Sequence, residues 1–520
     1  MRLEIFKNYQ QVHIWTGILS GLLLFICFVA GALTMFKTPL NQWALQADNR
    51  LPTIEYAAYD ELIQQVLEKH PEAAAEMTVY LPGAMPQQAP VTWLIEDPQT
   101  HAVEYWQATL DADDKLVSEK VAISAIGDFL DHLHRTAGIP GGDDHDAVGI
   151  FVMGVVSMLY FVAIVSGLII FLPGWFKDLF AVRKGKNSKR FWVDFHNILG
   201  ITALPFHIVI AVTTIVFAYH DVLYGAMQQW VYKDAPMFSR PAPKELDLAF
   251  NNLVPVDELR QTIQTMEADF EPEVLRYAGL GTPRARVLVG GNLDGQWIRG
   301  PEHAFWVSNP YTADSGYTAM LPSVSGVMGK IVNGFFTLHF GGFGGGLVHW
   351  LYFAMGLSGS LLFLTGNIIW IEARRKKQNN SETPPKQRRS VVILARLTVG
   401  VTLGTLAGIG LALLTAKLLP HADWDIAFWQ KTAYYVGFLG STVFALVYKP
   451  MKSAKILLLT LCSLLLALIA ATLLHWDTNA NNGVNAGVCL VCAALLAGLW
   501  ATQAHLKKRQ QQIPRDSVWS

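Results

Sequence analysis

Histidines recur at matching positions in the first 375 residues of the chain. His13 and His196 each stand near the start of an apolar stretch, and a glycine follows each of them four residues later. His134 and His339 each follow a leucine near the end of a long polar segment. Histidine is rare inside bilayers and marks a functional site there. The repeat predicts two pairs of equivalent histidines, each pair facing across a pseudo-two-fold axis.

Facing histidines have a definite chemistry. Two imidazoles that meet across a helix bundle form the arrangement of bis-histidine haem ligation. Neutral imidazole binds iron, and its second ring nitrogen needs a hydrogen-bond partner that fixes the tautomer. A single histidine at a membrane surface is more commonly a capping or snorkelling residue. We expect one haem between His13 and His196, a second between His134 and His339, and an electron path between the two membrane faces.

His207 has no counterpart in this pattern, because Leu24 occupies the equivalent position in the first apolar stretch. It lies eleven residues beyond His196, which on a straight helix is about 16 Å further along nearly the same face. It is either an alternative outer haem ligand or a relay. Gly17 and Gly200, one turn after the first pair, either let a flat macrocycle approach the backbone or serve helix packing.

The composition indicates the elements that carry these histidines. Of 520 residues, 52% are hydrophobic and 16% are charged, with a mean hydropathy of +0.29, whereas soluble proteins carry about 25% charged residues. Lysine and arginine total 40 against 41 acidic residues, so no net charge points to nucleic acid. Four cysteines do not form a disulfide scaffold. The sequence predicts an α-helical polytopic membrane protein.

Eight apolar stretches are long enough to span a bilayer. They cover residues 14–36, 148–172, 194–219, 345–371, 391–416, 431–448, 455–475 and 484–505. Clusters of lysine and arginine lie at 177–190, 374–377, 449–455 and 507–509. The positive-inside rule places all four clusters in the cytoplasm. Both chain termini are then cytoplasmic, and the two long loops face the other side.

The first four spans form a duplicated helix–domain–helix repeat. Each long loop carries an Asp-Glu-Leu helix start, at Asp60 and Asp257, followed by alternating residues typical of strands. The loops are therefore expected to be two small α+β domains. The expected order is 1–36 first span, 37–147 first domain, 148–172 second span, 173–193 basic loop, 194–219 third span, 220–344 second domain, 345–371 fourth span, 372–390 linker, 391–505 four-span bundle and 506–520 tail.

Several motifs carry a resemblance to a known family. The segment from Phe191 to Gly200 continues to Leu204-Pro205-Phe206-His207, and Leu133-His134-Arg135-Thr136 and the run from Leu338 to Gly345 accompany it. Together they resemble the PepSY-associated transmembrane family over about residues 1–375. The resemblance implies PepSY-like periplasmic domains in a bacterial inner-membrane protein. The family includes iron-regulated proteins and siderophore reductases with b-type haem.

These observations lead to one expected function and two rivals. We expect a di-haem oxidoreductase with two b-type haems that reduces a ferric siderophore or other ferric chelate in the periplasm. No Rossmann motif or large cytoplasmic domain is present, so the electron donor is quinol in the membrane lipid or a separate reductase. The rivals are a non-redox membrane binding or assembly protein and a transporter.

Overall fold

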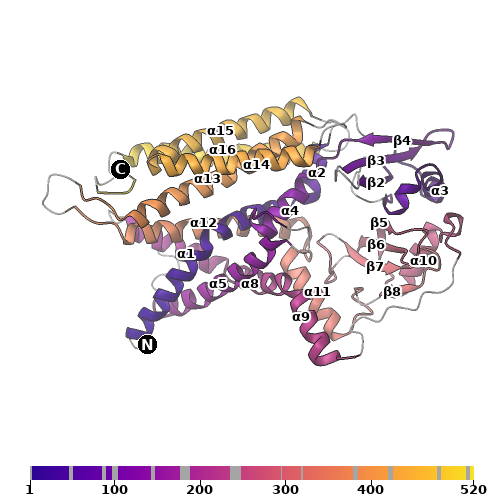
Figure 1. The fold of residues 1–520 in the computed structure, drawn as a ribbon, viewed down its shortest axis with the longest axis horizontal. Coiled ribbons are helices and arrows are strands. Elements are labelled where there is room, and N and C mark those ends of the chain that lie inside the picture. The colour runs from indigo at the N-terminus through magenta and orange to yellow at the C-terminus, as the bar shows by residue number, and fades with distance from the viewer. Residues whose placement is uncertain are drawn as a thin grey trace.

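The fold is described from a computed structural model of the whole chain. The described residues are 3–45, 51–82, 84, 89–96, 103–141, 147–175, 188–234, 247–293, 295–301, 303–317, 320–378, 384–419, 425–476, 482–510 and 516–519. Helices fill one end of the molecule and an antiparallel sheet the other (Figure 1). Both chain termini lie at the end remote from the sheet (Figure 1).

The helices of the repeat form a bundle of apolar segments. Its members are α1 (Leu3–Thr34), α5 (Val148–Phe171), α7 (Ser188–Thr202), α8 (Leu204–Ala218) and α12 (Gly345–Ala373). Helix α1 packs against α5 and α12, while α7 packs against α12 and α8 against α5. The first span of one repeat half (α1) and the first span of the other (α7 with α8) therefore both pack against α5 and α12.

Helices α7 and α8 form one broken span. Their axes differ by 69° at the break. Pro205 lies in the first turn of α8, where its missing N–H costs no helical hydrogen bond. The straight helix expected over 194–219 is thus bent, and His196 and His207 stand on different segments.

A second group of helices follows the repeat. It consists of α13 (Arg389–Leu418), α14 (Ile426–Val447), α15 (Pro450–Leu474) and α16 (Asn482–Gln510). We call these four helices the C-terminal bundle. Among the described residues, six helices are long and apolar enough to cross a membrane, or seven if α7 and α8 count as one span. Helix α14 coincides with the sixth expected stretch but is not among the six.

The sheet combines both repeat halves. Its eight strands run in the order β4-β3-β2-β1-β5-β6-β7-β8. They are β1 (Glu76–Tyr80), β2 (Val91–Glu96), β3 (Val103–Leu110), β4 (Leu116–Val121), β5 (Glu271–Ala278), β6 (Arg286–Asn292), β7 (Ala304–Ser308) and β8 (Ser315–Tyr317). Every neighbouring pair is antiparallel. The two loops therefore build one continuous sheet rather than two separate ones.

The central strand pair reflects the repeat. Strands β1 and β5 are equivalent in the two halves, and their register is centred on Thr78 opposite Arg276. An antiparallel pair of equivalent strands is what a two-fold axis perpendicular to a sheet generates. Met77 and Val79 of β1, like Leu275 and Tyr277 of β5, are buried in one shared core.

Helices cover one face of the sheet. Helix α3 (Tyr59–Lys69) and helix α10 (Val256–Met266) bury Leu62 and Leu259 against this core. Both helices begin where the Asp-Glu-Leu motifs predict. The amide of Val256 donates to the Asp60 carboxylate at 2.9 Å, so the two helix starts meet. The opposite face of the sheet is directed toward the helical bundle (Figure 1).

Short helices connect the sheet to the bundle. They are α2 (Lys37–Ala44) and α4 (Ile126–Thr136) in the first half, and α9 (His220–Met227) and α11 (Val327–Phe340) in the second. Shorter turns of helix occur at Tyr56–Ala58, Pro71–Ala74, Leu172–Gly174, Gln228–Tyr232 and Phe250–Asn252. Parts of the expected basic loop, linker and tail, at 176–187, 379–383 and 511–515, lie outside the described residues.

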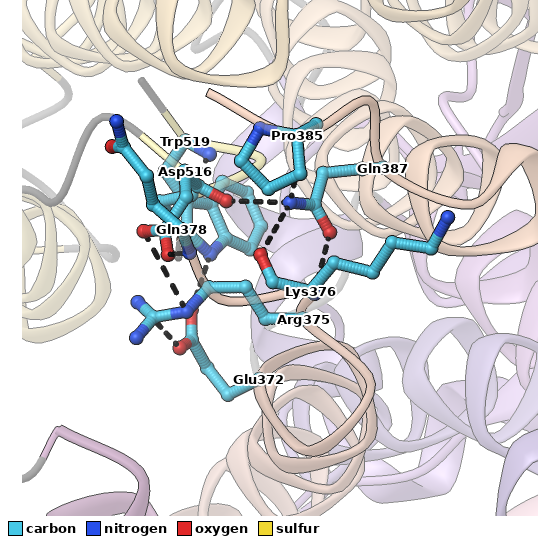
Figure 2. Close-up of polar contacts among 9 residues, drawn as sticks. Glu372, Arg375, Lys376, Gln378, Pro385, Gln387, Asp516 and Trp519 are labelled. Atoms are coloured by element: carbon cyan, nitrogen blue, oxygen red, sulfur yellow. Dashed lines mark hydrogen bonds and ion pairs between the residues drawn. The ribbon is translucent and has the colours of Figure 1, made fainter. Parts of the chain in front are cut away.

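The C-terminal tail closes the end of the molecule remote from the sheet. Asp516 accepts a hydrogen bond from the Gln378 amide at 2.6 Å, and its carbonyl accepts one from the Gln387 side chain at 2.7 Å (Figure 2). The Trp519 indole donates to Glu372 at 3.0 Å. These contacts join the end of α12 to the segment that precedes α13, so the tail ties the repeat to the C-terminal bundle.

Candidate functional site

Helices α1 and α7 bring His13 and His196 together. Their ring centroids are 6.2 Å apart, with the ring planes at 77°. A metal–imidazole bond is about 2 Å long, so two imidazoles on opposite sides of one metal have ring centroids about 6 Å apart. The spacing of this inner pair fits two axial ligands of one metal ion.

Each ring of the inner pair is oriented by the adjacent helix. The Nδ1 of His13 donates to the Ala163 carbonyl at 2.9 Å. The Nδ1 of His196 lies 3.1 Å from the Leu362 carbonyl and 3.0 Å from the Thr365 hydroxyl. The two carbonyl residues each stand four positions before a glycine of the repeat. The second-shell partner that a metal-binding imidazole needs is present on both sides.

Glycines at the backs of these rings allow the close packing. A Cβ at Gly167 would stand 2.9 Å from a carbon of the His13 ring. A Cβ at Gly366, the equivalent position, would be 3.5 Å from the His196 ring. At Gly17 a Cβ would meet no atom within 4 Å, and at Gly200 it would meet only Leu362 at 3.5 Å. The glycines that pack closely against the histidines are therefore those of α5 and α12, and not Gly17 and Gly200.

Helices α4 and α11 bring His134 and His339 together as an outer pair. Their ring centroids are also 6.2 Å apart, with the ring planes at 42°. The His134 Nδ1 donates to the Cys27 carbonyl at 3.0 Å. A Cβ at Gly31 would stand 2.6 Å from this nitrogen, so only glycine fits there. The outer pair repeats the spacing of the inner pair.

The second ring of the outer pair has a side-chain partner. The His339 Nδ1 lies 2.7 Å from the Thr213 hydroxyl, which itself donates to the Val209 carbonyl at 2.7 Å. Because the hydroxyl proton is engaged there, the Thr213 oxygen accepts the proton of His339. Burial, together with the neighbouring His134, lowers the pKa of His339 to about 3, so this ring is neutral at physiological pH.

All four Nδ1 atoms are therefore hydrogen-bond donors. In a neutral imidazole with a protonated Nδ1, the Nε2 carries the lone pair that binds a metal. Among the described residues, no group of three or more His, Cys, Asp or Glu side chains is arranged to hold a metal ion. Each pair supplies two ligands, which suits a metal whose remaining positions a macrocycle occupies. The residues present fit haem.

His207 lies between the two pairs. It is 1% exposed, its Nδ1 is 2.7 Å from the Tyr160 hydroxyl, and its Nε2 has no hydrogen-bond partner. Tyr160 stands seven residues before Gly167 on α5, and His207 six residues before Thr213 on α8. These separations place it about 10 Å from the level of each pair.

An aromatic cluster surrounds His207. Phe28 lies 6.0 Å from it between ring centroids, 5.8 Å from Tyr160 and 5.0 Å from Phe363. The outer pair forms without His207, because His134 has His339 as its ring neighbour. His207 therefore stands apart from the outer pair, and both roles expected for it, alternative outer ligand and relay, stay predictions.

An outer cavity separates the sheet from the bundle. Its volume is about 1200 Å³. Strands β1, β2, β3 and β5 form one wall, and helix α2, the start of α4 and residues 342–346 form the opposite side. This second side includes the start of α4, the helix that carries His134. Ionisable lining residues include Lys37, Asp128, Glu273, Arg276, His303 and His349.

Four of the ionisable groups in the cavity wall are already paired with one another. Lys37 lies 2.7 Å from Asp128, and His303 lies 3.0 Å from Glu273. The glycine-rich run after His339 lines this cavity, where Gly341 and Gly345 have φ values of +70° and +57°. These two positive φ values make the run a tight turn of the backbone.

Sequence reasoning did not find the partners of the histidines. Gly167 and Gly366 belong to a repeated motif at the ends of the second and fourth spans, and that repetition was an available signal. No sequence pattern marks the other partners, which are Tyr160, Thr213 and Cys27. Their roles depend on which helix face each ring meets.

Comparison with known proteins identifies the region that holds both pairs. A family model described as PepSY-associated TM region matches residues 10–373. This match includes His207 and the four paired histidines, and it ends shortly before the C-terminal bundle begins. No curated protein matches the chain.

Proposed function

Because the chain belongs to the PepSY-associated transmembrane family, we propose that it is a di-haem oxidoreductase of the bacterial inner membrane. It reduces a ferric chelate, such as a ferric siderophore, in the periplasm. The observation that carries the proposal is the duplicated histidine geometry. Two pairs share a centroid distance of 6.2 Å, and all four rings donate through Nδ1.

The chain's own residues hold and orient the proposed cofactor. His13 and His196 would hold the inner b-type haem, and His134 and His339 would hold the outer one. Haem supplies reversible one-electron transfer, which a polypeptide of this composition lacks. The carbonyls of Ala163, Leu362 and Cys27 and the Thr213 hydroxyl hold the ligand rings in the metal-binding tautomer.

The space between the pairs is closed to water. His207, Tyr160, Phe28 and Phe363 fill it, and all four are less than 9% exposed. The Nδ1 of His207 shares a hydrogen bond with the Tyr160 hydroxyl at 2.7 Å. In this proposal His207 is a relay group between the haems and not an axial ligand.

The outer cavity receives the chelate. Its volume of about 1200 Å³ is large enough for a chelator of several hundred daltons. Fe(III) binds hard oxygen ligands far more tightly than Fe(II) does, so one-electron reduction releases the metal. Electrons enter from quinol in the lipid or from a separate reductase on the cytoplasmic side.

The proposed orientation puts both termini in the cytoplasm. Arg374, Arg375, Lys376 and Lys377 follow α12 at the end remote from the sheet, and Lys449 and Lys452 lie at the start of α15. The Arg396 guanidinium donates to the Leu446 carbonyl, so the end of α14 lies beside the start of α13. We count α14 as an eighth span on this basis. The positive-inside rule then makes this side cytoplasmic.

Haem stoichiometry tests the proposal. Protein purified from haem-replete cells and assayed as the pyridine haemochrome is expected to contain two haems per chain. Its Soret band is expected to shift on reduction with dithionite. A colourless, fully folded preparation contradicts the proposal and favours the binding or transport alternatives.

Histidine variants test the pairing. His13→Ala and His196→Ala are each expected to remove the same haem, about half of the total. His134→Ala and His339→Ala are each expected to remove the other haem. His220→Ala, outside both pairs, is the matched control and retains both. If His207→Ala removes a haem while His339→Ala retains two, the assignment of the outer pair is wrong.

A further inference from the structure

The C-terminal bundle lies outside the matched family region, yet α14 contacts the helix that carries His134. We propose that α14 is a brace that positions α4, and that Gln430, Tyr434 and Tyr435 are its positioning residues. The functional meaning of this brace rests on the proposed role of His134 as a haem ligand. The contacts themselves do not depend on that role.

The first contact holds the start of α4. Gln430 donates from Nε2 to the Ser124 hydroxyl at 2.7 Å. Both residues are 1% exposed. A buried amide and hydroxyl that pair with each other fix a relative position, because each loses its partner if the helices separate. Ser124 stands two residues before Ile126, where α4 begins.

The second and third contacts hold the middle and the end of α4. The Tyr434 ring meets Phe129 edge-on at 5.4 Å between centroids. The Tyr435 hydroxyl donates to the Gly138 carbonyl at 3.0 Å. Gly138 has φ +75° and follows Ala137 at φ +51°, so this hydrogen bond fixes the left-handed turn that ends the helix. Three residues of α14 thus hold α4 along its whole length.

The bundle also fixes α2, the neighbour of α4. The Lys417 ammonium, buried in the last turn of α13, donates to the Trp43 carbonyl. The Trp43 indole donates to Thr472 of α15 at 3.1 Å. Helix α2 in turn holds α4, because Asn41 accepts a hydrogen bond from the Gly127 amide at 2.7 Å.

The second repeat half is held differently. Val327 and Met328, at the start of α11, are 77% and 76% exposed, and Ile331 is 49% exposed. The outer pair therefore joins one histidine on a braced helix to one on a helix whose first turn is open. The brace therefore positions His134, whereas His339 is positioned by its own repeat half.

Amide hydrogen exchange tests the brace without reference to haem. In Gln430→Ala and Tyr435→Phe, amides of residues 126–138 are expected to exchange roughly tenfold faster or more, with α11 unchanged. Val436→Ala is the matched control, because this neighbouring side chain is 65% exposed and faces away from α4. Unchanged exchange in α4 overturns the proposal.

A double-variant cycle separates the contact from general loss of fold. Ser124→Ala removes the other partner of Gln430, so the double variant is expected to exchange no faster than either single variant. Additive increases overturn the assignment of this contact.

Redox titration of the full-length protein tests the consequence for haem. The brace variants are expected to shift the midpoint of one haem and leave the other unchanged. If the unmodified protein carries no haem, the proposed function fails, while the exchange measurement still decides whether α14 holds α4. If both haems shift equally, the brace does not act through His134.

Discussion

At the scale of single residues, the two histidine pairs share one arrangement. Each ring donates through Nδ1 to a neighbouring helix, which leaves the Nε2 lone pair for a ligand-binding role. The sequence repeat was sufficient to predict which histidines pair. It did not identify their partners, because a carbonyl group has no sequence signature and the contact depends on helix rotation.

The glycine behind His13 provides a matched comparison. Gly167→Ala would place a Cβ 2.9 Å from the His13 ring, whereas Gly366→Ala would place one 3.5 Å from His196, which is ordinary contact. We expect Gly167→Ala to displace the ring and perturb the absorption spectrum of the inner haem. Gly366→Ala is expected to leave it unchanged. Equal spectra for the two variants would contradict this packing argument.

Thr213 offers a test of the outer pair. Thr213→Val removes the acceptor of the His339 proton but keeps the shape of the side chain. Outer-shell substitutions of this kind reduce metal affinity by roughly 10–100-fold. We expect faster transfer of one haem to apomyoglobin from Thr213→Val, and an unchanged rate from Thr213→Ser. Fast transfer from both variants would exclude the hydroxyl as the cause.

At the scale of elements, the pairing of β1 with β5 was not predicted. Each strand-forming segment is visible from its alternating residues, but the pair joins segments that lie far apart in the chain. Register between distant strands is set by tertiary packing, which local patterns do not contain. The bend between α7 and α8 had a signal in Pro205, yet proline occurs in kinked and straight spans alike.

Proline substitution tests the central strand. Thr78→Pro places a residue without an N–H in a strand that has neighbours on both sides, and proline is confined to edge strands and bulges. We expect loss of the joined sheet, seen as rapid proteolysis between residues 51 and 120 in the intact chain. Thr78→Val keeps the N–H and is the control. Resistance of the proline variant to protease would rule out this central pairing.

Helix α14 shows why the number of spans is difficult to predict. Gln430, Lys431 and Tyr434 interrupt its apolar pattern, and two of them contact α4. Residues that hold a neighbouring element are polar or aromatic, so they lower the mean hydropathy that identifies a span. The residues of α14 that contact α4 therefore also lower the mean hydropathy by which a span is recognised.

At the scale of the whole molecule, the C-terminal tail adds a further connection between two helical groups that also meet at α12 with α13 and at α4 with α14. Trp519 packs against Ile371 and Val391, and also beside Leu457. Its indole donates to Glu372, which lies 3.6 Å from Arg375. Figure 2 shows Trp519, Glu372 and Arg375 close to Asp516.

Removing this indole is expected to loosen the whole assembly. Truncation of a fully buried tryptophan costs about 3–5 kcal/mol, and Trp519 is only partly buried. We expect Trp519→Ala to lower the free energy of unfolding by about 1–2 kcal/mol, measured as a lower midpoint of thermal unfolding in detergent. Trp519→Phe keeps the packing and is expected to lose less. Equal losses would assign the effect to the hydrogen bond alone.

The joined sheet also has a consequence for biosynthesis. Strand β1 leaves the ribosome long before its partner β5, and at roughly 5–20 residues per second the intervening chain takes roughly 10–40 s to make. During that interval one edge of β1 has no partner strand, and an open edge invites pairing with other chains. The order of translation thus sets a waiting period in which this edge of the half-built sheet is open.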